Sequence, residues 1–296
     1  MLKRTLFFGN PYHLSTRHRQ LVAADKTSGE EKTIPIEDIG FIVFEHSQIT
    51  FTQSVMQLLA ENNTAVVFCD TRHHPSSLLL HLDTNTIQAE LFRHQVEATL
   101  PLKKQLWRQT VKAKISNQAR LLDLLKLDGE ALHYMATRVK SGDTTGLEAK
   151  AARKYWPRLF AGNFTRERYG QAPNPALNYG YAIIRAAVAR ALAGSGLLAT
   201  LGIHHRNRYN AFALADDIME PYRPYVDMAV TDMLDQQMDT GTLGKVEKAF
   251  LLELLSMDVR IGGLKRPLMV ALSHTTASLA RCFAGTASKL TYPELP

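Results

Sequence analysis

The spacing of apolar residues along the chain changes once, near residue 85. Before that point, short apolar and β-branched runs bounded by turn residues predict strands. These runs cover residues 5–8, 19–24, 39–44 and 65–69. Ser28-Gly29 favours a hairpin after the second run, and the pattern at 52–61 predicts one helix. The first part of the chain is therefore expected to be a small β-rich unit.

Beyond residue 85 the apolar positions recur with the period of a helix. The predicted helices cover residues 87–97, 103–125, 130–140, 145–160, 175–192, 211–238, 242–255 and 267–283. Residues 83–85 are the best candidate for a linker between the two patterns. The sequence thus predicts an α+β fold, in which a small N-terminal β-rich domain (1–84) is joined to a larger all-α C-terminal domain (85–296).

The composition is that of a globular protein, with 296 residues of which 45% are hydrophobic and 21% charged. Cys69 and Cys282 are the two cysteines, which excludes a disulfide framework or a four-thiolate zinc site and favours a reducing compartment. No run approaches the length of a membrane span or of a signal-peptide core. We therefore expect a cytoplasmic protein with no membrane partner.

The formal net charge of +7 is distributed unevenly. Residues 1–84 sum to −2, residues 93–208 hold 20 bases and 7 acids, and residues 209–296 sum to −3. The segment between Lys103 and Arg120 contains no acid at all, and Lys104, Arg108 and Lys112 recur there every four residues. Such a stripe on one helix face is suited to a phosphate backbone, although a solvated helix face is the simpler alternative.

Two further segments of this basic region contain candidate site residues. Glu148 stands near the start of a predicted helix with Arg153 a turn and a half later. The simpler interpretation of Glu148 is an acid that complements the helix dipole. In a second helix, opened by Asn174-Pro175, Asn178 and Tyr179 are surface residues or contact nucleic acid, and the sequence does not choose between the two.

A polar loop and an acidic helix follow. Adjacent His204 and His205 are followed by Arg206 and Arg208, in a segment that is a poor candidate for core because it is so polar; a solvated loop is the alternative. Asp217 and Glu220 stand three residues apart, so a helix places both carboxylates on one face. Like charges at that separation repel unless a cation or a proton lies between them. Pro221 predicts a kink or break directly after the pair.

Together these residues form a consistent donor set of carboxylates and imidazole without thiolate. Glu148, His205, Asp217 and Glu220 suit Mg²⁺ or Mn²⁺, and the imidazole favours Mn²⁺. An ion of this kind beside a basic segment is what phosphodiester chemistry uses. The residues themselves therefore indicate a metal-dependent enzyme that acts on nucleic acid.

The order and wording of these motifs resemble a known family. The Glu148 segment, the helix at 174–185, Gly202-Ile203-His204-His205 and the segment 217–227 occur in the same order as in the CRISPR-associated integrase and endonuclease family, Cas-one. The segments 201–207 and 214–224 are especially similar to type II members. The opening Arg4-Thr5-Leu6-Phe7-Phe8 and the compact β region also fit, and the similarity spans nearly the whole chain.

The resemblance implies roles for individual residues. Glu148 matches the family's metal-binding glutamate, His205 its metal-binding histidine, and Glu220 the acid that completes the ion site, with Asp217 as a companion acid. The implied reaction is a metal-dependent transesterification, in which the 3′-hydroxyl of a short captured DNA attacks a phosphodiester at each end of a CRISPR repeat. The implied partners are double-stranded DNA, a second copy of the chain bound through the β domain, and a dimer of the small Cas-two protein in a heterohexamer. Other type II components, such as the effector nuclease, are further candidate partners.

Two other function classes compete with this interpretation. A structural nucleic-acid-binding protein without catalysis would use its acids as helix caps and would bind DNA without regard to Mg²⁺ or Mn²⁺. A hydrolase with a His-carboxylate metal site would act on a small molecule, but such a substrate has no use for a long acid-free basic tract. The leading hypothesis remains a DNA integrase and endonuclease of CRISPR adaptation.

Overall fold

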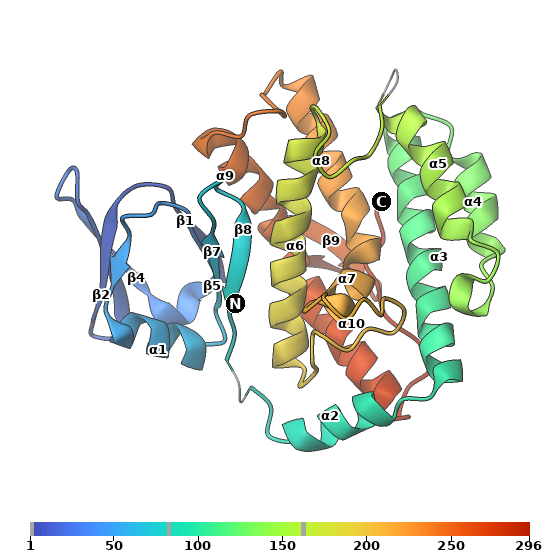
Figure 1. Ribbon diagram of the computed structural model, residues 1–296, viewed down its shortest axis with the longest axis horizontal. Helices are drawn as coiled ribbons and strands as arrows, with labels where there is room; N and C mark the ends of the chain where they lie inside the picture. The colour runs from blue at the N-terminus through green and yellow to red at the C-terminus, as the bar shows by residue number, and fades with distance from the viewer. Residues whose placement is uncertain (1–2, 82–83, 161–163) are drawn as a thin grey trace.

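A computed structural model describes residues 3–81, 84–160 and 164–296 of the chain. Strands occupy its N-terminal part and helices most of the remainder (Figure 1). The change from strands to helices falls between β8 (Pro75–Leu79) and α2 (Gln88–Glu97). Asp83 of the expected linker lies outside the described residues.

Among the described residues, eight strands and one α-helix form the strand-rich part. The strands are β1 (Arg4–Phe8), β2 (Tyr12–Arg17), β3 (Gln20–Asp25), β4 (Glu31–Pro35), β5 (Ile39–Phe44), β6 (Thr50–Phe51), β7 (Ala65–Cys69) and β8 (Pro75–Leu79), and the helix is α1 (Gln53–Glu61). They build two four-stranded sheets with the orders β1-β5-β7-β8 and β4-β3-β2-β6. The hairpin predicted at Ser28-Gly29 is confirmed, since β3 and β4 pair antiparallel on either side of it.

The first sheet has a core on each of its faces. Strand β5 is buried along its whole length, as expected for a parallel strand covered on both sides. Phe41 and Val43 pack into the cluster of the helical part, whereas Ile42 and Phe44 pack with α1 and the second sheet. The strand-rich part and the helical part therefore share the core on one face of this sheet, and the division at residue 84 into two domains stays a prediction.

Helices dominate the C-terminal part. They are α2 (Gln88–Glu97), α3 (Leu100–Leu124), α4 (Glu130–Thr137), α5 (Leu147–Leu159), α6 (Asn174–Gly194), α7 (Ala213–Met219), α8 (Arg223–Asp235), α9 (Lys245–Glu253) and α10 (Leu268–Phe283). Figure 1 shows α6 in the middle of the molecule, between the strands and the group formed by α3, α4 and α5. Gly180 lets α6 approach α8 closely, because a Cβ there would overlap Val226.

The predicted helix at 211–238 is interrupted where Pro221 stands. A short 3₁₀ turn, Glu220–Tyr222, separates α7 from α8, which confirms the break expected from the proline. Proline removes one backbone donor and clashes with the preceding turn, so the α-helix cannot continue unchanged through it. The interruption places Glu220 at the junction between two helices that both pack on α6.

The α+β fold class is confirmed, with one addition inside the helical part. A hairpin of β9 (Asp258–Ile261) and β10 (Leu264–Pro267) turns at Gly262-Gly263, a pair that favours two-residue hairpin loops. Within the described ranges, none of the helices combines the length and the apolar character needed to cross a bilayer.

Candidate active site

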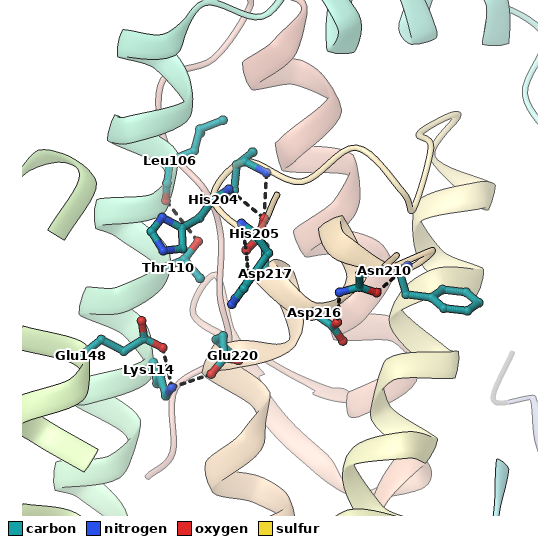
Figure 2. A network of polar contacts seen from close by, with 12 residues as sticks. Leu106, Thr110, Lys114, Glu148, His204, His205, Asn210, Asp216, Asp217 and Glu220 are labelled. Atoms are coloured by element: carbon teal, nitrogen blue, oxygen red, sulfur yellow. Dashed lines mark hydrogen bonds and ion pairs between the residues drawn. The ribbon is translucent and has the colours of Figure 1, made fainter. Parts of the chain in front are cut away.

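Three charged side chains from separate elements meet at the junction of α3, α5 and the 3₁₀ turn (Figure 2). The ammonium of Lys114, on α3, lies 2.7 Å from Glu148 Oε1 and 2.5 Å from Glu220 Oε2. The two carboxylate oxygens are therefore no further apart than these two distances combined. The structure thus brings together Glu148 and Glu220, which stand far apart in the sequence, around one cation.

Glu148 is positioned by the start of α5. Gly146 precedes the helix in the left-handed region, and the carboxylate of Asp143 accepts hydrogen bonds from the backbone N–H groups of Leu147 and Glu148 at 2.9 and 3.0 Å. Asp143 thus satisfies the free donors of the first turn. The Glu148 side chain, with 25% of its surface exposed, is free to reach Lys114 instead of capping its own helix.

Glu220 is buried at the junction of α7 and the 3₁₀ turn, with 4% of its surface exposed. Its Oε1 accepts a hydrogen bond of 2.8 Å from Arg223 Nε, and its Oε2 faces Lys114. Burial opposes ionisation, but attraction to Arg223 and Lys114 outweighs it and lowers the pKa of Glu220 to about 2. Glu220 is therefore a buried carboxylate that stays charged throughout the physiological range.

Lys114 is charged for the reciprocal reason. Burial acts to lower its pKa, but attraction to Glu220 and Glu148 outweighs burial and raises it. The sequence stripe did not single out Lys114, because it stands out of step with Lys104, Arg108 and Lys112. A signal was nevertheless available, since a position two residues from Lys112 lies about 200° around the helix and so faces the core.

His205 is held by Asp217 through both backbone and side chain. The Asp217 carboxylate is fully buried and accepts hydrogen bonds from the N–H groups of Ile203, His204 and His205 at 2.7, 2.9 and 3.2 Å. His205 Nδ1 lies 2.5 Å from Asp217 Oδ1. This hydrogen bond raises the pKa of His205, and the more distant charges of Glu220 and Glu148 add to the effect against the opposing burial.

The loop can wrap around Asp217 because residue 202 is glycine. A Cβ at Gly202 would stand 2.8 Å from Asp217 Oδ2 and 2.5 Å from the carbonyl oxygen of His205. His204 packs on the other side, where its ring stacks on Trp107 of α3 with centroids 4.1 Å apart. Trp107 also meets the His205 ring edge-on at 5.8 Å. Trp107 is thus a positioning residue that the sequence patterns did not identify, because a buried tryptophan on a helix resembles ordinary core.

These contacts define the surroundings of Asp217. Both of its oxygens accept hydrogen bonds from the loop 203–205, so it orients His205, and its own part in binding a metal stays a prediction. The Lys114 ammonium lies against Glu220, whereas Asp217 faces the loop. Each of the two acids has its own partners, which the spacing of three residues could not reveal.

The predicted contact of Tyr179 with nucleic acid is wrong. It is fully buried inside α6 and its ring lies 5.9 Å from Lys248 Nζ, so it is a core residue and cannot contact nucleic acid. Asn178 is partly buried, and its side chain bonds to Arg166 Nη2 at 2.7 Å and to the carbonyl of Arg168 at 2.6 Å. Asn178 therefore ties the loop before α6 to the helix, and its contact with nucleic acid stays a prediction.

The predicted DNA-binding bases lie on the surface. Lys104, Arg108 and Lys112 on α3 are exposed, as are Arg153 on α5 and the loop residues Arg206 and Arg208. Arg108 donates from Nε to the carbonyl of Val139, and Arg208 covers the ring of Tyr209. Their positions leave these cations available to phosphate, while the contact itself stays a prediction.

The fit of a divalent ion to this site follows from its donors. As the side chains stand, the described residues include no group of three or more His, Cys, Asp or Glu arranged to hold a metal, since Lys114 separates the carboxylates. The carboxylate pair nevertheless already accommodates a cation. A histidine that gives one ring nitrogen to a buried carboxylate is also the usual arrangement of a metal-binding histidine, with the other nitrogen left for the ion. Glu148, Glu220 and His205 therefore fit such an ion.

Comparison with known proteins identifies the family. The sequence model of the family "CRISPR associated protein Cas1" matches residues 7–253. The CRISPR-associated endonuclease Cas1 of Neisseria meningitidis serogroup C (strain 8013) is 38% identical over 263 residues, which cover 88% of this chain and 86% of the relative.

Two solved structures share the fold. A casposase bound to integration product has a TM-score of 0.80 at 19% identity, covering 98% of this chain and 92% of the other. A Cas6-RT-Cas1–Cas2 complex has a TM-score of 0.76 at 18% identity, covering 99% of this chain and 36% of the other. The motifs, the α+β fold, the family match and the close relative agree, and the chain belongs to the CRISPR-associated Cas1 family.

Proposed function

We propose that this chain is a divalent-ion-dependent DNA integrase and endonuclease of CRISPR adaptation. It inserts short captured DNA into the CRISPR array when a 3′-hydroxyl attacks a phosphodiester of the repeat. The observation that carries the proposal is the convergence of Glu148 and Glu220 on one cationic group beside His205, whose Nδ1 is held by Asp217. The similar relative is named an endonuclease, and the similar casposase is bound to an integration product, which supports the same reaction here.

The cofactor in this proposal is Mg²⁺ or Mn²⁺, held by Glu148, Glu220 and His205. When bound, such an ion polarises the phosphodiester and activates the attacking oxygen. Glu148 and Glu220 supply ionised oxygens, and His205 supplies the ring nitrogen that Asp217 leaves free. Asp217 orients the imidazole and fixes which of its nitrogens carries the proton.

The exposed bases position the nucleic acid. Lys104, Arg108 and Lys112 follow one exposed face of α3, whereas Lys114 of the same helix points inward to the carboxylates. Arg153 and the loop bases Arg206 and Arg208 extend the positive surface on α5 and beside His205. These side chains neutralise phosphates and carry no base specificity of their own.

The proposed partners are double-stranded DNA, a second copy of the chain and the small Cas2 protein. The Cas6-RT-Cas1–Cas2 complex supports Cas2 as a partner, since its chain contains a region of this fold. We propose that the strand-rich part, whose charge is close to neutral, forms the homodimer surface, while the helical part meets DNA. A heterohexamer with a Cas2 dimer and contacts with other type II components belong to the same proposal.

Conservative substitution of the carboxylates tests the reaction. Purified Glu148→Gln and Glu220→Gln proteins are incubated with a labelled prespacer, a repeat-containing plasmid, purified Cas2 and Mn²⁺. Because an ion at a phosphodiester contributes several kcal/mol, each variant is expected to lose about 10³-fold or more in strand-transfer rate. Glu253→Gln, an exposed acid on α9, is the matched control and keeps the wild-type rate.

The same samples separate the competing functions. A chelator abolishes strand transfer by the wild type but leaves duplex binding, measured by fluorescence anisotropy, largely in place. Strand transfer by Glu148→Gln at the wild-type rate contradicts the proposal. Duplex affinity without any metal-dependent product from the wild type favours a structural DNA-binding protein, and failure of duplex DNA to bind favours a small-molecule hydrolase.

A further inference from the structure

One cation already stands between the two candidate metal ligands. The Lys114 ammonium contacts Glu148 Oε1 at 2.7 Å and Glu220 Oε2 at 2.5 Å, and the side chain is 12% exposed. It reaches this position from α3, which also contacts α5 and the 3₁₀ turn that carry the two acids. Lys114 is therefore part of the site itself and not of the basic surface outside it.

The site depends on this ammonium for its charge balance. Glu220 has a second cationic partner in Arg223, which bonds its Oε1 at 2.8 Å. Among the described residues, the Glu148 carboxylate pairs with one charged side chain, that of Lys114. Without Lys114, Glu148 would face Glu220 with no cation between them. Lys114 thus holds the two carboxylates together at the separation observed.

The charges of these four groups also set the cost of binding an ion. Lys114 and Arg223 balance Glu148 and Glu220, so the cluster is neutral as it stands. A divalent cation added beside Lys114 would leave the cluster at an excess of two positive charges in a partly buried setting, where repulsion is poorly screened. If the ammonium leaves, the same ion meets a cluster of net negative charge. Binding of the ion and retention of Lys114 between the carboxylates are therefore opposed.

We propose that Lys114 is an internal counter-ion, which occupies the cation position between Glu148 and Glu220 until a divalent ion displaces it. The inference rests on the proposed function, since it takes these carboxylates as ion ligands. Lys114 is a positioning residue in this scheme, because it keeps the ligands in place in the metal-free protein. Its four-carbon stem is flexible enough to move the ammonium away without moving α3.

The scheme also accounts for the selection of divalent over monovalent ions. A monovalent ion that replaces the ammonium gains no charge over the group it removes. Mg²⁺ or Mn²⁺ brings a second charge to the same two carboxylates, and this stronger attraction offsets the loss of the ammonium contacts. The metal-free protein is therefore a closed state of the site, held by a contact that the correct class of ion can break.

Titration with Mn²⁺ tests the proposal without recourse to activity. The free Mn²⁺ signal in electron paramagnetic resonance reports binding to the wild type, Lys114→Met and Lys114→Gln. Removal of the competing charge is expected to tighten Mn²⁺ binding by about tenfold or more, equal to about 1.4 kcal/mol. Lys114→Arg keeps the charge and should bind no tighter than the wild type. Lys150→Met is the matched control, because it removes an exposed cation two residues after Glu148.

Thermal unfolding supplies a second readout on the same proteins. Without metal, Lys114→Met should melt below the wild type, because two carboxylates lose their common partner. Saturating Mn²⁺ should raise its melting temperature more than it raises that of the wild type. If Lys114→Met does not fold without metal, Lys114→Gln carries the measurement, since its amide can still hydrogen-bond a carboxylate without bringing a charge.

The outcomes separate this inference from the proposed function. Wild-type affinity for Mn²⁺ in both Lys114→Met and Lys114→Gln, or tighter binding in Lys114→Arg as well, overturns the counter-ion role. Mn²⁺ binding by the wild type that is unaffected by Glu148→Gln and Glu220→Gln contradicts the ion site and therefore the proposed function. Tighter binding in the two neutral variants alone supports the displacement.

Discussion

The strand-rich part and the helical part of this chain differ in the charged side chains that they bury. Among the described residues before α2, Glu45 is the one charged residue that is buried, and the rest of the core there is almost wholly apolar. The helical part buries Asp217, Glu220 and Asp227 within the interval from α7 to α8. Burying a charge is costly unless a partner compensates it. The concentration of such groups in one short interval therefore marks the site, whereas the strand-rich part reads as a scaffold.

The two buried lysine–glutamate contacts make the difference concrete. Glu45, at the end of β5, pairs with Lys248 of α9, with His73 3.4 Å from its Oε1. That pair joins the two parts of the molecule, and its cation faces one carboxylate. Lys114 instead faces two carboxylates, with His205 nearby (Figure 2). The same ion-pair chemistry fastens the fold in one place and, in our proposal, occupies the position of a metal ion in the other.

The largest expected effect comes from breaking the pair between the two parts. Glu45→Ala leaves Lys248 buried without its carboxylate, and such a loss typically costs about 3–5 kcal/mol. Urea denaturation of the metal-free protein measures it. Lys265→Ala removes an exposed pair with Asp258 at 3.3 Å and should cost about 1 kcal/mol or less. Equal losses in the two variants would contradict the view of Glu45–Lys248 as a fastening.

That view is sharpened by a double variant. In Glu45→Leu/Lys248→Met both charges are replaced by apolar groups of comparable size, so neither is left unpaired. We expect it to recover most of the stability that Glu45→Ala loses. Recovery would identify the cost as that of an unpaired buried charge and not of lost packing at the boundary.

A second prediction concerns the dependence of stability on pH. Asp227 lies fully buried and accepts hydrogen bonds from Tyr155 at 2.7 Å and from Tyr181. Burial raises its pKa from 3.8 to about 6, against the opposing effect of the two tyrosines. The native state therefore keeps a proton that the unfolded state has released. The stabilisation is complete below about pH 4 and is lost as the pH rises through about 6, by roughly 2–3 kcal/mol.

Substitution of Asp227 isolates this contribution. Asp227→Asn has no proton to lose, so its free energy of unfolding should vary less between pH 4 and pH 7 than that of the wild type. Chemical denaturation at intervals of half a pH unit measures both curves. Parallel curves for the two proteins would assign the dependence to other groups and would remove Asp227 from the comparison.

The smallest effect is expected at Asp217, which acts through His205. Loss of such a carboxylate behind a metal-binding histidine typically costs about 10–100-fold in activity or metal affinity. Asp217→Asn is expected to show this loss in strand transfer. It should also lower the pKa of His205, since the hydrogen bond to Asp217 is the main cause of the raised value. A proton NMR titration of the histidines reads that shift directly.

Asp216→Asn provides the matched control for Asp217. Asp216 neighbours Asp217 but points away from the loop, where it accepts a hydrogen bond from Asn210 at 2.7 Å. It should leave both the rate and the His205 titration close to wild type. A loss of rate in Asp217→Asn without any change in the His205 pKa would argue for a general structural role instead.

Much of this architecture could be read from the chain because it depends on local rules. The buried strands β5 and β7 are continuous apolar runs, the long helices have a clear apolar period, and Pro221 predicted the break after α7. Strand β2 escaped detection because four of its six residues are polar or charged, and its pairing with β3 supplies what its own pattern lacks. The hairpin of β9 and β10 was missed although Gly262-Gly263 is a hairpin signal, since each strand has four residues.

The candidate ligands could be proposed from the sequence for a similar reason. Glu148, His205 and Glu220 are carboxylates and an imidazole in a region otherwise dominated by bases, and their order along the chain matches a family pattern. Tyr179 was assigned wrongly and the contacts of Asp217 were not predicted, because residue type and spacing do not say what lies opposite a side chain. Asp217 met three backbone N–H groups and Tyr179 met the core.

The sequence by itself determined most of the elements, the segregation of charge and the acids and histidine that we propose for the site. Helical period and proline chemistry act within a few residues, so their effects can be predicted without a structure. Only the tertiary structure decided that Lys114 lies between Glu148 and Glu220, and that Asp217 contacts His205. The period of a helix fixes the face on which a side chain lies, but the partner on that face comes from another helix, and packing alone selects it.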